Sequence, residues 1–350
     1  MTDTKSSPSY LRIATEEAWA PPELIALYRK HLAEGTIEDI GFSSLMGYFL
    51  GSTHPQPQSV VARLQDAADR RIGDMDATGI AHQVLALTAP GTQVLDAEEG
   101  SRMARLANDR LSSIVRAHPA RFSALAAVSY EDVDGAVAEL RRAVTELGLK
   151  GLILNDHIRG TYIDDPRFAP LLEELENLDV PLYLHPNTPP DNMIAPYREA
   201  GLDGAVHGFG ASAGLHLLRI ITSGLLDRHP RLRIVCGHLG EGLPFWLHRI
   251  DHMHAKQVAS GRYEAIKPLR QPPSAYFSSQ IWLTTSGMPW APAIMFTRDV
   301  IGADRVMYAM DYPYQYDVAE VDAQDALPIG EAEKAEFFEL TARRVFNLTF

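Results

Sequence analysis

Four side chains that can bind a divalent cation stand at the ends of short apolar runs in this 350-residue chain. Glu16 closes the run IATEE, His185 closes PLYLH, His238 closes RIVCGH and Asp311 closes VMYAMD. Two imidazoles and two carboxylates supply mixed nitrogen and oxygen ligands, which suit Zn²⁺, Mn²⁺ and related ions. The pattern predicts a metal centre if the fold brings these four positions together.

The chain alternates short apolar runs with longer amphipathic ones, which is typical of parallel βα units. Strands are expected over residues 11–17, 82–88, 122–128, 151–155, 181–185, 233–238, 281–286 and 306–311. Helices are expected over residues 59–75, 102–117, 132–147 and 168–177, among others. This order predicts an α/β fold, the (β/α)8 TIM barrel, whose active site lies at the carboxyl ends of the strands. A doubly wound open sheet is the alternative, but no glycine-rich phosphate motif follows the first strand.

Two stretches, residues 32–58 and 186–210, are too long for simple connections and predict extended βα loops on the catalytic face. No linker divides the chain, so residues 10–350 are expected to form one domain after a disordered lead of residues 1–9. That lead is polar and lacks the apolar core of a secretory signal, which predicts a cytoplasmic protein.

The composition excludes several classes of function. A net charge of −13 argues against nucleic acid and anionic membrane partners, because both require a basic surface. No apolar run approaches the ~20 residues of a membrane-spanning helix. The single cysteine, Cys236, excludes an intrachain disulfide and a cysteine-rich zinc site, and no GxSxG nucleophile motif occurs.

Each candidate ligand also has a purely structural interpretation. His185 could be a hydrogen-bonded histidine at a buried turn, Asp311 a turn former before proline, His238 a helix cap and Glu16 a solvated carboxylate. Those interpretations must hold at four strand ends that a barrel brings together. The metal centre is therefore the stronger hypothesis.

A second unit follows the sixth predicted strand in the sequence GHLGEG. Glu241 lies three residues after His238, in or near the first turn of the next helix, where it could hydrogen-bond one ring nitrogen for proton relay. A capping carboxylate is the alternative. Arg249 follows on the same segment and could bind a substrate carboxylate through its bidentate fork, or remain an ordinary surface arginine.

Alternation along the first strand separates its two glutamates. Glu16 and Ala18 share one face, predicted to line the barrel interior. Glu17 shares the other face with Leu11 and Ile13, so a structural or supporting role is expected for it.

Several long strings carry a family resemblance: YLRIATEEAW, LYLHPNTPPD, GHLGEGLPFWLHRIDHMH, WLTTSG and RVMYAMDYPYQY. From about residue 10 to the C-terminus the chain resembles the decarboxylase branch of the amidohydrolase superfamily. That branch includes the 5-carboxyvanillate, gamma-resorcylate and 2,3-dihydroxybenzoate decarboxylases.

The resemblance implies one divalent metal ion per subunit, manganese or else zinc or magnesium, with no organic cofactor. It implies that Glu16, His185 and Asp311 bind the metal and that His238, paired with Glu241, lies beside it as a further candidate ligand. It also implies a non-oxidative decarboxylation of a small aromatic carboxylate of the ortho-hydroxybenzoate type, in which Asp311 protonates the ring before CO2 leaves. Further implications are a homodimer or homotetramer and substrate-binding residues at the positions of Arg249 and Tyr314.

The chain departs from the carboxyvanillate enzymes in one loop. Those enzymes carry a substrate-binding arginine after the first strand, whereas no arginine occurs here between Arg29 and Arg63. A metal-dependent hydrolase of the same superfamily, a lactonase or amidase, is the alternative function. Such hydrolases usually carry His-x-His on the first strand, and Ala18 stands where the second histidine would be. A non-catalytic metal-binding protein is the other alternative.

Overall fold

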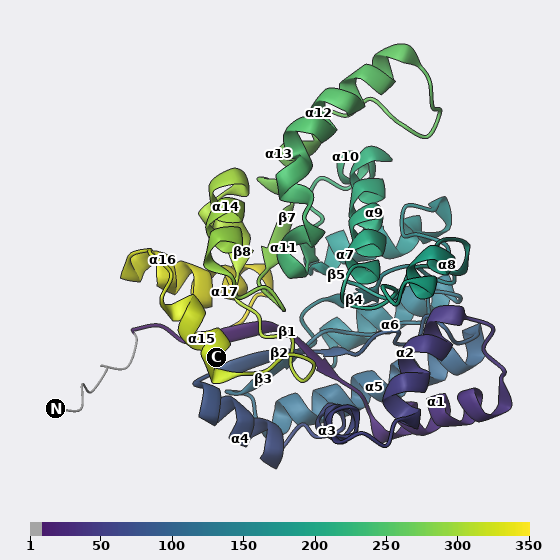
Figure 1. Ribbon diagram of the computed structural model, residues 1–350, viewed down its shortest axis with the longest axis vertical. Helices are drawn as coiled ribbons and strands as arrows, with labels where there is room; N and C mark the ends of the chain where they lie inside the picture. The colour runs from purple at the N-terminus through teal and green to yellow at the C-terminus, as the bar shows by residue number, and fades with distance from the viewer. Residues whose placement is uncertain (1–8) are drawn as a thin grey trace.

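A computed structural model describes residues 9–350 of the chain (Figure 1). The disordered lead predicted for residues 1–9 lies, apart from Ser9, outside the described residues. Within the described part, no helix combines the length and apolar character needed to cross a membrane.

All eight predicted strands are present, and their order along the chain is also their order around the barrel. Strands β1 to β3 form one parallel sheet and β4 to β8 another, and a bridge between Ala126 and Leu152 joins the two. The (β/α)8 barrel predicted from the sequence is confirmed. The strands are β1 (Ile13–Trp19), β2 (His82–Leu87), β3 (Phe122–Ala124), β4 (Leu152–Asn155), β5 (Leu182–His185), β6 (Ile234–Cys236), β7 (Ile281–Thr284) and β8 (Val306–Met307).

Several strands end earlier than predicted. β8 stops at Met307 because the next amide, that of Tyr308, donates to the carbonyl of Phe337 in the C-terminal helical segment. β6 stops at Cys236 because the chain then enters a left-handed turn. At both strand ends the backbone therefore leaves the sheet within a few residues before a proposed metal-binding or catalytic residue, Asp311 after β8 and His238 after β6.

The helices cover the outside of the barrel, with insertions on the carboxyl side of the strands (Figure 1). They are α1 (Pro22–Glu34), α2 (Ile40–Gly51), α3 (Pro55–Leu64), α4 (Asp69–Thr78), α5 (Ala97–Ala117), α6 (Val133–Thr145), α7 (Ala169–Leu178), α8 (Asp191–Glu199), α9 (Gly208–Thr222), α10 (Leu225–Arg228), α11 (His238–Glu241), α12 (Leu243–Ser260), α13 (Pro273–Phe277), α14 (Ala291–Ile301), α15 (Val318–Asp325), α16 (Glu331–Ala335) and α17 (Thr341–Val345). Short 3-10 or π segments are η1 (Pro166–Phe168), η2 (Ala303–Arg305) and η3 (Glu336–Leu340).

Two predictions about these segments need correction. The single helix expected over residues 59–75 is two helices, α3 and α4, because Asp66 turns the chain between them and its carboxylate accepts from the amide of Ala68 at 2.9 Å. The two extended βα loops are also not loops throughout, since α2 lies in the first and α8 in the second.

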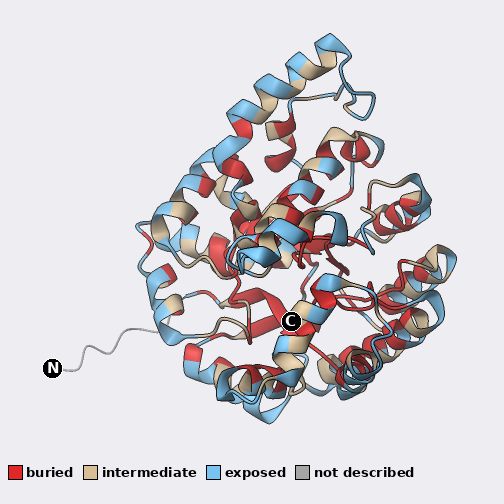
Figure 2. Cartoon of the chain, turned by 45° about the vertical axis from the view of Figure 1, so that its right-hand side comes forward, coloured by how far each residue is buried: buried red, intermediate tan, exposed pale blue. Residues whose placement is uncertain are grey.

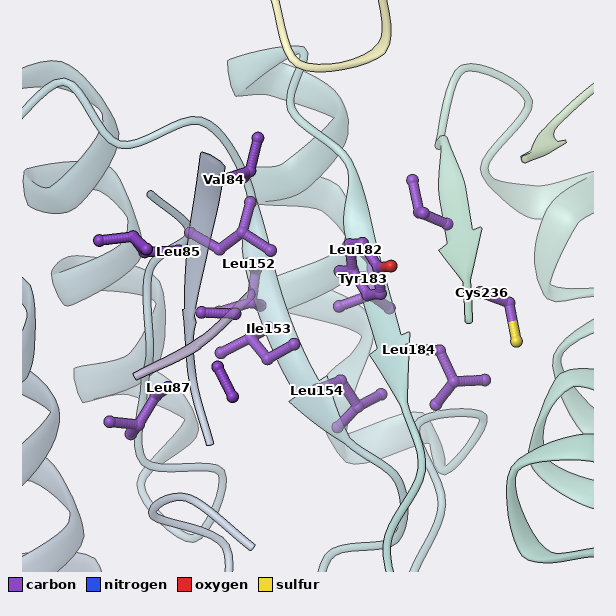
Figure 3. Close-up of a cluster of buried hydrophobic side chains, with 14 of the residues drawn as sticks. Val84, Leu85, Leu87, Leu152, Ile153, Leu154, Leu182, Tyr183, Leu184 and Cys236 are labelled. Atoms are coloured by element: carbon purple, nitrogen blue, oxygen red, sulfur yellow. The ribbon is translucent and has the colours of Figure 1, made fainter. Parts of the chain in front are cut away.

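The strands form the centre of the core. Every residue of β2, β4 and β6 is buried, and Figure 3 shows side chains of β2, β4 and β5 packing together with Cys236 from β6. Figure 2 shows the buried strands surrounded by helices whose outer faces are exposed. Helix α12 extends away from the barrel, and much of its length is exposed (Figures 1 and 2).

The buried His82 of β2 makes stability depend on pH. Its Nδ1 donates to Ala120 O at 3.0 Å, its Nε2 accepts from Ser123 Oγ at 2.9 Å, and its ring stacks on that of Phe350 with 3.7 Å between the ring centres. Burial lowers the pKa of His82 from 6.5 to about 4. Folding therefore favours the neutral ring, so its contribution is complete above pH 6.5 and is lost as the pH falls toward 4.

We expect His82→Gln, which cannot titrate, to reduce this acid sensitivity. Between pH 7.5 and pH 5 the wild-type protein should lose about 2 kcal/mol more unfolding free energy than the variant. Urea denaturation at the two pH values measures the difference. Equal losses of unfolding free energy in the two proteins would show that His82 does not cause the loss of stability at low pH.

Candidate metal centre

Glu16 presents one carboxylate oxygen that is hydrogen-bonded and one that is not. Its Oε2 accepts from Thr284 Oγ1 at 2.8 Å, from Ser286 Oγ at 2.6 Å and from the hydroxyl of Tyr183. Its Oε1 is buried and has no hydrogen-bond partner among the described residues. A buried unpaired carboxylate oxygen is costly, so Oε1 fits a position that faces a cation.

His185 and Asp311 complete a group around that oxygen. His185 Nε2 lies 3.6 Å from Glu16 Oε1, and one ligand atom from each of the three residues lies within 4.8 Å of the others. The other ring nitrogen, Nδ1, is 2.7 Å from the carbonyl oxygen of Pro186 and donates its proton to it. Nε2 of the neutral ring is therefore unprotonated and free as a metal ligand. Three donors of mixed nitrogen and oxygen type therefore fit one divalent cation.

His238 lies beside this group and is bonded to Glu241. Its Nδ1 is 2.9 Å from Glu241 Oε1, so the hydrogen bond expected from the sequence is present. Its Nε2 is 3.8 Å from Glu16 Oε1 and 4.0 Å from Asp311 Oδ2. The three-residue group does not include His238, whose assignment as a metal ligand stays a prediction.

The backbone that carries this pair differs from the prediction. The short segment labelled α11 is not a right-handed helical turn, because residues 238–242 all have positive φ, from 49° at His238 to 78° at Gly242. This left-handed turn brings side chains three residues apart together, and α12 begins only afterwards, at Leu243. Gly237 precedes the turn, and a Cβ there would lie 2.7 Å from both oxygens of Glu16.

The ionisable side chains around the metal site shift one another's pKa values. Burial acts to raise the pKa of Glu16, but the neighbouring His238 and His185 outweigh it, so the pKa is lowered. Burial acts to lower the pKa of His238, but Glu241 and Glu16 raise it well above its ordinary value. Burial raises the pKa of Asp311, although His238 opposes the shift.

The cavity beside Glu16 is lined largely by apolar atoms from other strand ends. Ala86 and Leu87 of β2, Thr88 after it and Ile153 of β4 line it together with the group itself. Tyr314 hydrogen-bonds Thr88 Oγ1 at 2.6 Å, which places it beside this cavity. This cavity is about 10 Å³, which is room for an ion or about one water molecule rather than for an aromatic ring.

Arg249 does not lie against this cavity in the same chain. It is exposed on α12, and no described residue in contact with the metal group binds it. Its role in substrate binding stays a prediction.

The residues that orient Glu16 were missed from the sequence. Tyr183 and His185 are two residues apart on β5 and therefore share a face, a signal that could have placed Tyr183 in the site. Thr284 and Ser286 have the same spacing around the end of β7. These three donors fix the rotamer of a metal ligand, as supporting residues of metal sites do.

The three donors come from Glu16 in the second half of β1, His185 at the end of β5 and Asp311 in the segment after β8. Together with the barrel they define a barrel metalloenzyme. A family model described as Amidohydrolase matches residues 47–348. The chain therefore belongs to the amidohydrolase family.

Several characterised relatives are similar along most of the chain. Gamma-resorcylate decarboxylase of Rhizobium sp. (strain MTP-10005) is 37% identical over 294 residues, covering 82% of this chain and 89% of its own. The crystal structure of 5-carboxyvanillate decarboxylase from Novosphingobium aromaticivorans DSM 12444, with manganese and 3-methoxy-4-hydroxy-5-nitrobenzoic acid, is 46% identical with a TM-score of 0.95 and covers 97% of this chain and 98% of its own. A 2,6-dihydroxybenzoate decarboxylase bound to 2,6-dihydroxybenzoate is 34% identical with a TM-score of 0.84, covering 97% of this chain and 100% of its own.

Proposed function

We propose that the protein catalyses the metal-dependent, non-oxidative decarboxylation of an ortho-hydroxybenzoate. The observation that carries this proposal is the unpaired Oε1 of Glu16, facing His185 and Asp311 in a cavity with apolar walls. Relatives named as aromatic acid decarboxylases support it, including one crystallised with manganese and a hydroxy-nitrobenzoate. The sequence of β1 supports it against the hydrolase alternative, because Glu16 and Ala18 occupy the two positions of the His-x-His motif and β1 carries no imidazole.

The chemistry requires a proton to reach the ring before CO2 leaves, since direct loss would create an unstabilised carbanion in the ring plane. Glu16, His185 and Asp311 would hold the cation, which when bound supplies Lewis-acid stabilisation of negative charge on substrate oxygens. Asp311, in its protonated form, would give its proton to the ring carbon that bears the carboxylate. The electrons of the breaking C–C bond then restore the aromatic ring as CO2 departs.

His238 and Glu241 would assist from the other side of the group. The Nδ1 proton of His238 is directed to Glu241, so Nε2 faces Glu16 and Asp311 and can exchange a proton with the phenol or with Asp311. The bond to Glu241 holds the ring in that orientation. We propose substrate contacts for Tyr314, which adjoins the cavity through Thr88, and for Arg249.

CO2 release from a panel of hydroxybenzoates by the manganese-loaded protein tests the function. We expect turnover only with acids that carry a hydroxyl ortho to the carboxylate. Hydrolysis of lactones or amides without CO2 release would replace the proposal with the hydrolase, and a metal-loaded protein inert toward both panels would support the non-catalytic alternative.

We also propose that residues 10–350 act as one cytoplasmic domain that assembles as a homodimer or homotetramer. One hydrophobic cluster includes residues from Tyr10 to Leu348. Large apolar side chains are exposed on and beside the extended helix α12, which supports self-association through that region. They include Phe245, Trp246, Trp290 and Phe296, which are 72%, 52%, 66% and 42% exposed. Light scattering on the purified protein measures the assembly.

Gly210 of α9 leaves room for the Glu241 carboxylate. A Cβ at Gly210 would lie 2.9 Å from Glu241 Oε2, closer than carbon and oxygen approach each other. We expect Gly210→Ala to displace this carboxylate from His238 and to lower kcat about 10- to 100-fold, as loss of a supporting contact does. The fold should persist, because alanine favours a helix more than glycine does, by about 1 kcal/mol.

Gly214→Ala is the matched control on the same helix. Its Cβ would lie 3.6 Å from Glu241 Cβ, an ordinary contact that leaves the carboxylate in place. CO2-release kinetics and thermal melts of the two variants measure the difference. Equal kcat values in both would show that Gly210 does not control Glu241.

A further inference from the structure

Glu17 binds the backbone on both sides of Asp311. Its Oε1 accepts from the amide of Met310 at 3.0 Å, and its Oε2 accepts from the amide of Tyr312 at 3.3 Å. The side chain is fully buried. One carboxylate therefore holds the two peptide groups that flank a proposed metal ligand.

Asp311 needs such support because its backbone is unusual. Its φ is 71°, in the left-handed region that residues with a Cβ adopt rarely. Conformations of this kind persist only where surrounding contacts determine them. The two hydrogen bonds from Glu17 are contacts of that type, applied at the neighbours of Asp311.

β1 and the segment that follows β8, residues 308–312, meet at a junction that we call the seam. Side chains as well as backbone groups make the hydrogen bonds across it. β8 ends at Met307, and Ala18 N to Tyr312 O, at 2.7 Å, is the backbone bond that joins β1 to the segment carrying Asp311. Thr15 Oγ1 adds a side-chain bond to Tyr308 O at 2.8 Å. The pairing of β1 with β2 shifts register between Ala14 and Glu17.

Glu17 lies toward Gln83 of β2 and Arg71 of α4, on the opposite side of β1 from the partners of Glu16, and it also reaches the segment that carries Asp311. Glu16 faces the barrel interior as predicted, since its partners Tyr183 and Thr284 belong to β5 and β7.

Two buried residues fix the Glu17 carboxylate in turn. Gln83 Nε2 donates to Glu17 Oε2 at 3.2 Å, and Gln83 Oε1 accepts from Arg71 Nη1 at 3.2 Å. Arg71 also donates to Ala18 O at 2.7 Å, and its guanidinium lies 4.4 Å from the ring centre of Tyr312. The network thus ties Glu17 to both sides of the seam, and it leaves the carboxylate no freedom to turn away.

We propose that Glu17 is a positioning residue that sets the carboxylate of Asp311 for metal binding and for proton transfer to the substrate. The proton-transfer part rests on the proposed decarboxylation, whereas the metal-binding part does not. Glu17 is not a member of the metal-binding group, although it also lines the cavity beside Glu16, and both of its carboxylate oxygens accept hydrogen bonds from other groups.

The test is Glu17→Gln in the full-length protein. The amide group would retain one acceptor for Met310 N but would set an NH2 against the donors Tyr312 N and Gln83 Nε2. We expect Mn²⁺ affinity, measured by titration of the metal-stripped protein, to fall about 10- to 100-fold, the range typical of supporting residues. With saturating manganese, kcat should fall while KM changes little.

Thr15→Val is the matched control, because it removes a buried hydrogen bond from the same seam, at Tyr308 rather than beside Asp311. It should lower the melting temperature and leave Mn²⁺ affinity unchanged. An unchanged affinity in Glu17→Gln, or an equal loss in both variants, overturns the proposal. If Glu17→Gln does not fold, Glu17→Asp, which is too short to reach both amides, is judged by the same two criteria.

The metal titration separates this proposal from the proposed function. Weakened Mn²⁺ binding by Glu17→Gln in a protein that releases no CO2 from any hydroxybenzoate would support the positioning role and refute the decarboxylase. Normal Mn²⁺ binding by a Glu17→Gln variant that still releases CO2 would refute the positioning role and support the decarboxylase.

Discussion

Replacing Glu16 with glutamine is expected to lower Mn²⁺ affinity by more than about 100-fold and to abolish CO2 release with it. Changes at supporting residues alone cost about 10- to 100-fold in metal affinity, and Glu16 is a proposed ligand. The substitution removes the negative charge from a buried oxygen that faces His185 Nε2 at 3.6 Å. Isothermal titration with manganese and metal analysis of the dialysed protein measure the loss.

The fold should survive this change. The amide oxygen of glutamine can still accept from Thr284, Ser286 and Tyr183, so the three donors around Oε2 keep a partner. Ser286→Ala is a useful comparison, since it removes one of these donors and leaves the charge of Glu16 in place. We expect a loss of affinity of about 10-fold or less for that variant. One tightly bound manganese per chain in Glu16→Gln would refute the ligand assignment.

The metal-binding group could be predicted because a barrel imposes one geometry on all strand ends. Once eight parallel strands are arranged in order, Glu16, His185 and Asp311 must meet at the same face, although nearly 300 residues separate the first from the last. Strand ends alone do not distinguish ligands from structural residues, however. Asn155 also ends a strand, and its amide donates to Leu87 O at 3.2 Å, between β4 and β2.

What escaped prediction depends on backbone conformations that sequence periodicity does not report. The left-handed turn from His238 to Gly242 includes non-glycine residues at positive φ. Glycine and asparagine, the residue types that usually indicate such a conformation, therefore do not predict the whole turn. The pairing of β1 with β2 shifts register between Ala14 and Glu17, which alternation of residue types does not reveal. The break after α3 depends on Asp66, whose turn competes with a helical pattern that continues on both sides. In each case local hydrogen bonds and tertiary contacts decide the outcome.

Replacing Asp311 with asparagine is expected to separate metal binding from proton transfer. The amide can still present an oxygen toward the cation position, but it carries no acidic proton for the ring carbon. General acid catalysis contributes about 10²- to 10⁴-fold, so we expect kcat to fall by about 100- to 10,000-fold. Asparagine also tolerates the left-handed backbone better than most residues, so the φ of 71° should add little strain.

The measurement pairs CO2 release with metal content in the same samples. Glu16→Gln should lose both, whereas Asp311→Asn should retain enough manganese at saturating concentrations to show that turnover fails at a later step. Substrate binding should also persist in Asp311→Asn, because manganese is retained. The ultraviolet spectrum of a hydroxybenzoate in the presence of the protein measures that binding. Near-normal turnover in that variant with manganese bound would exclude Asp311 as the proton donor and leave His238, whose Nε2 lies 4.0 Å from Asp311 Oδ2, as the group that must protonate the ring.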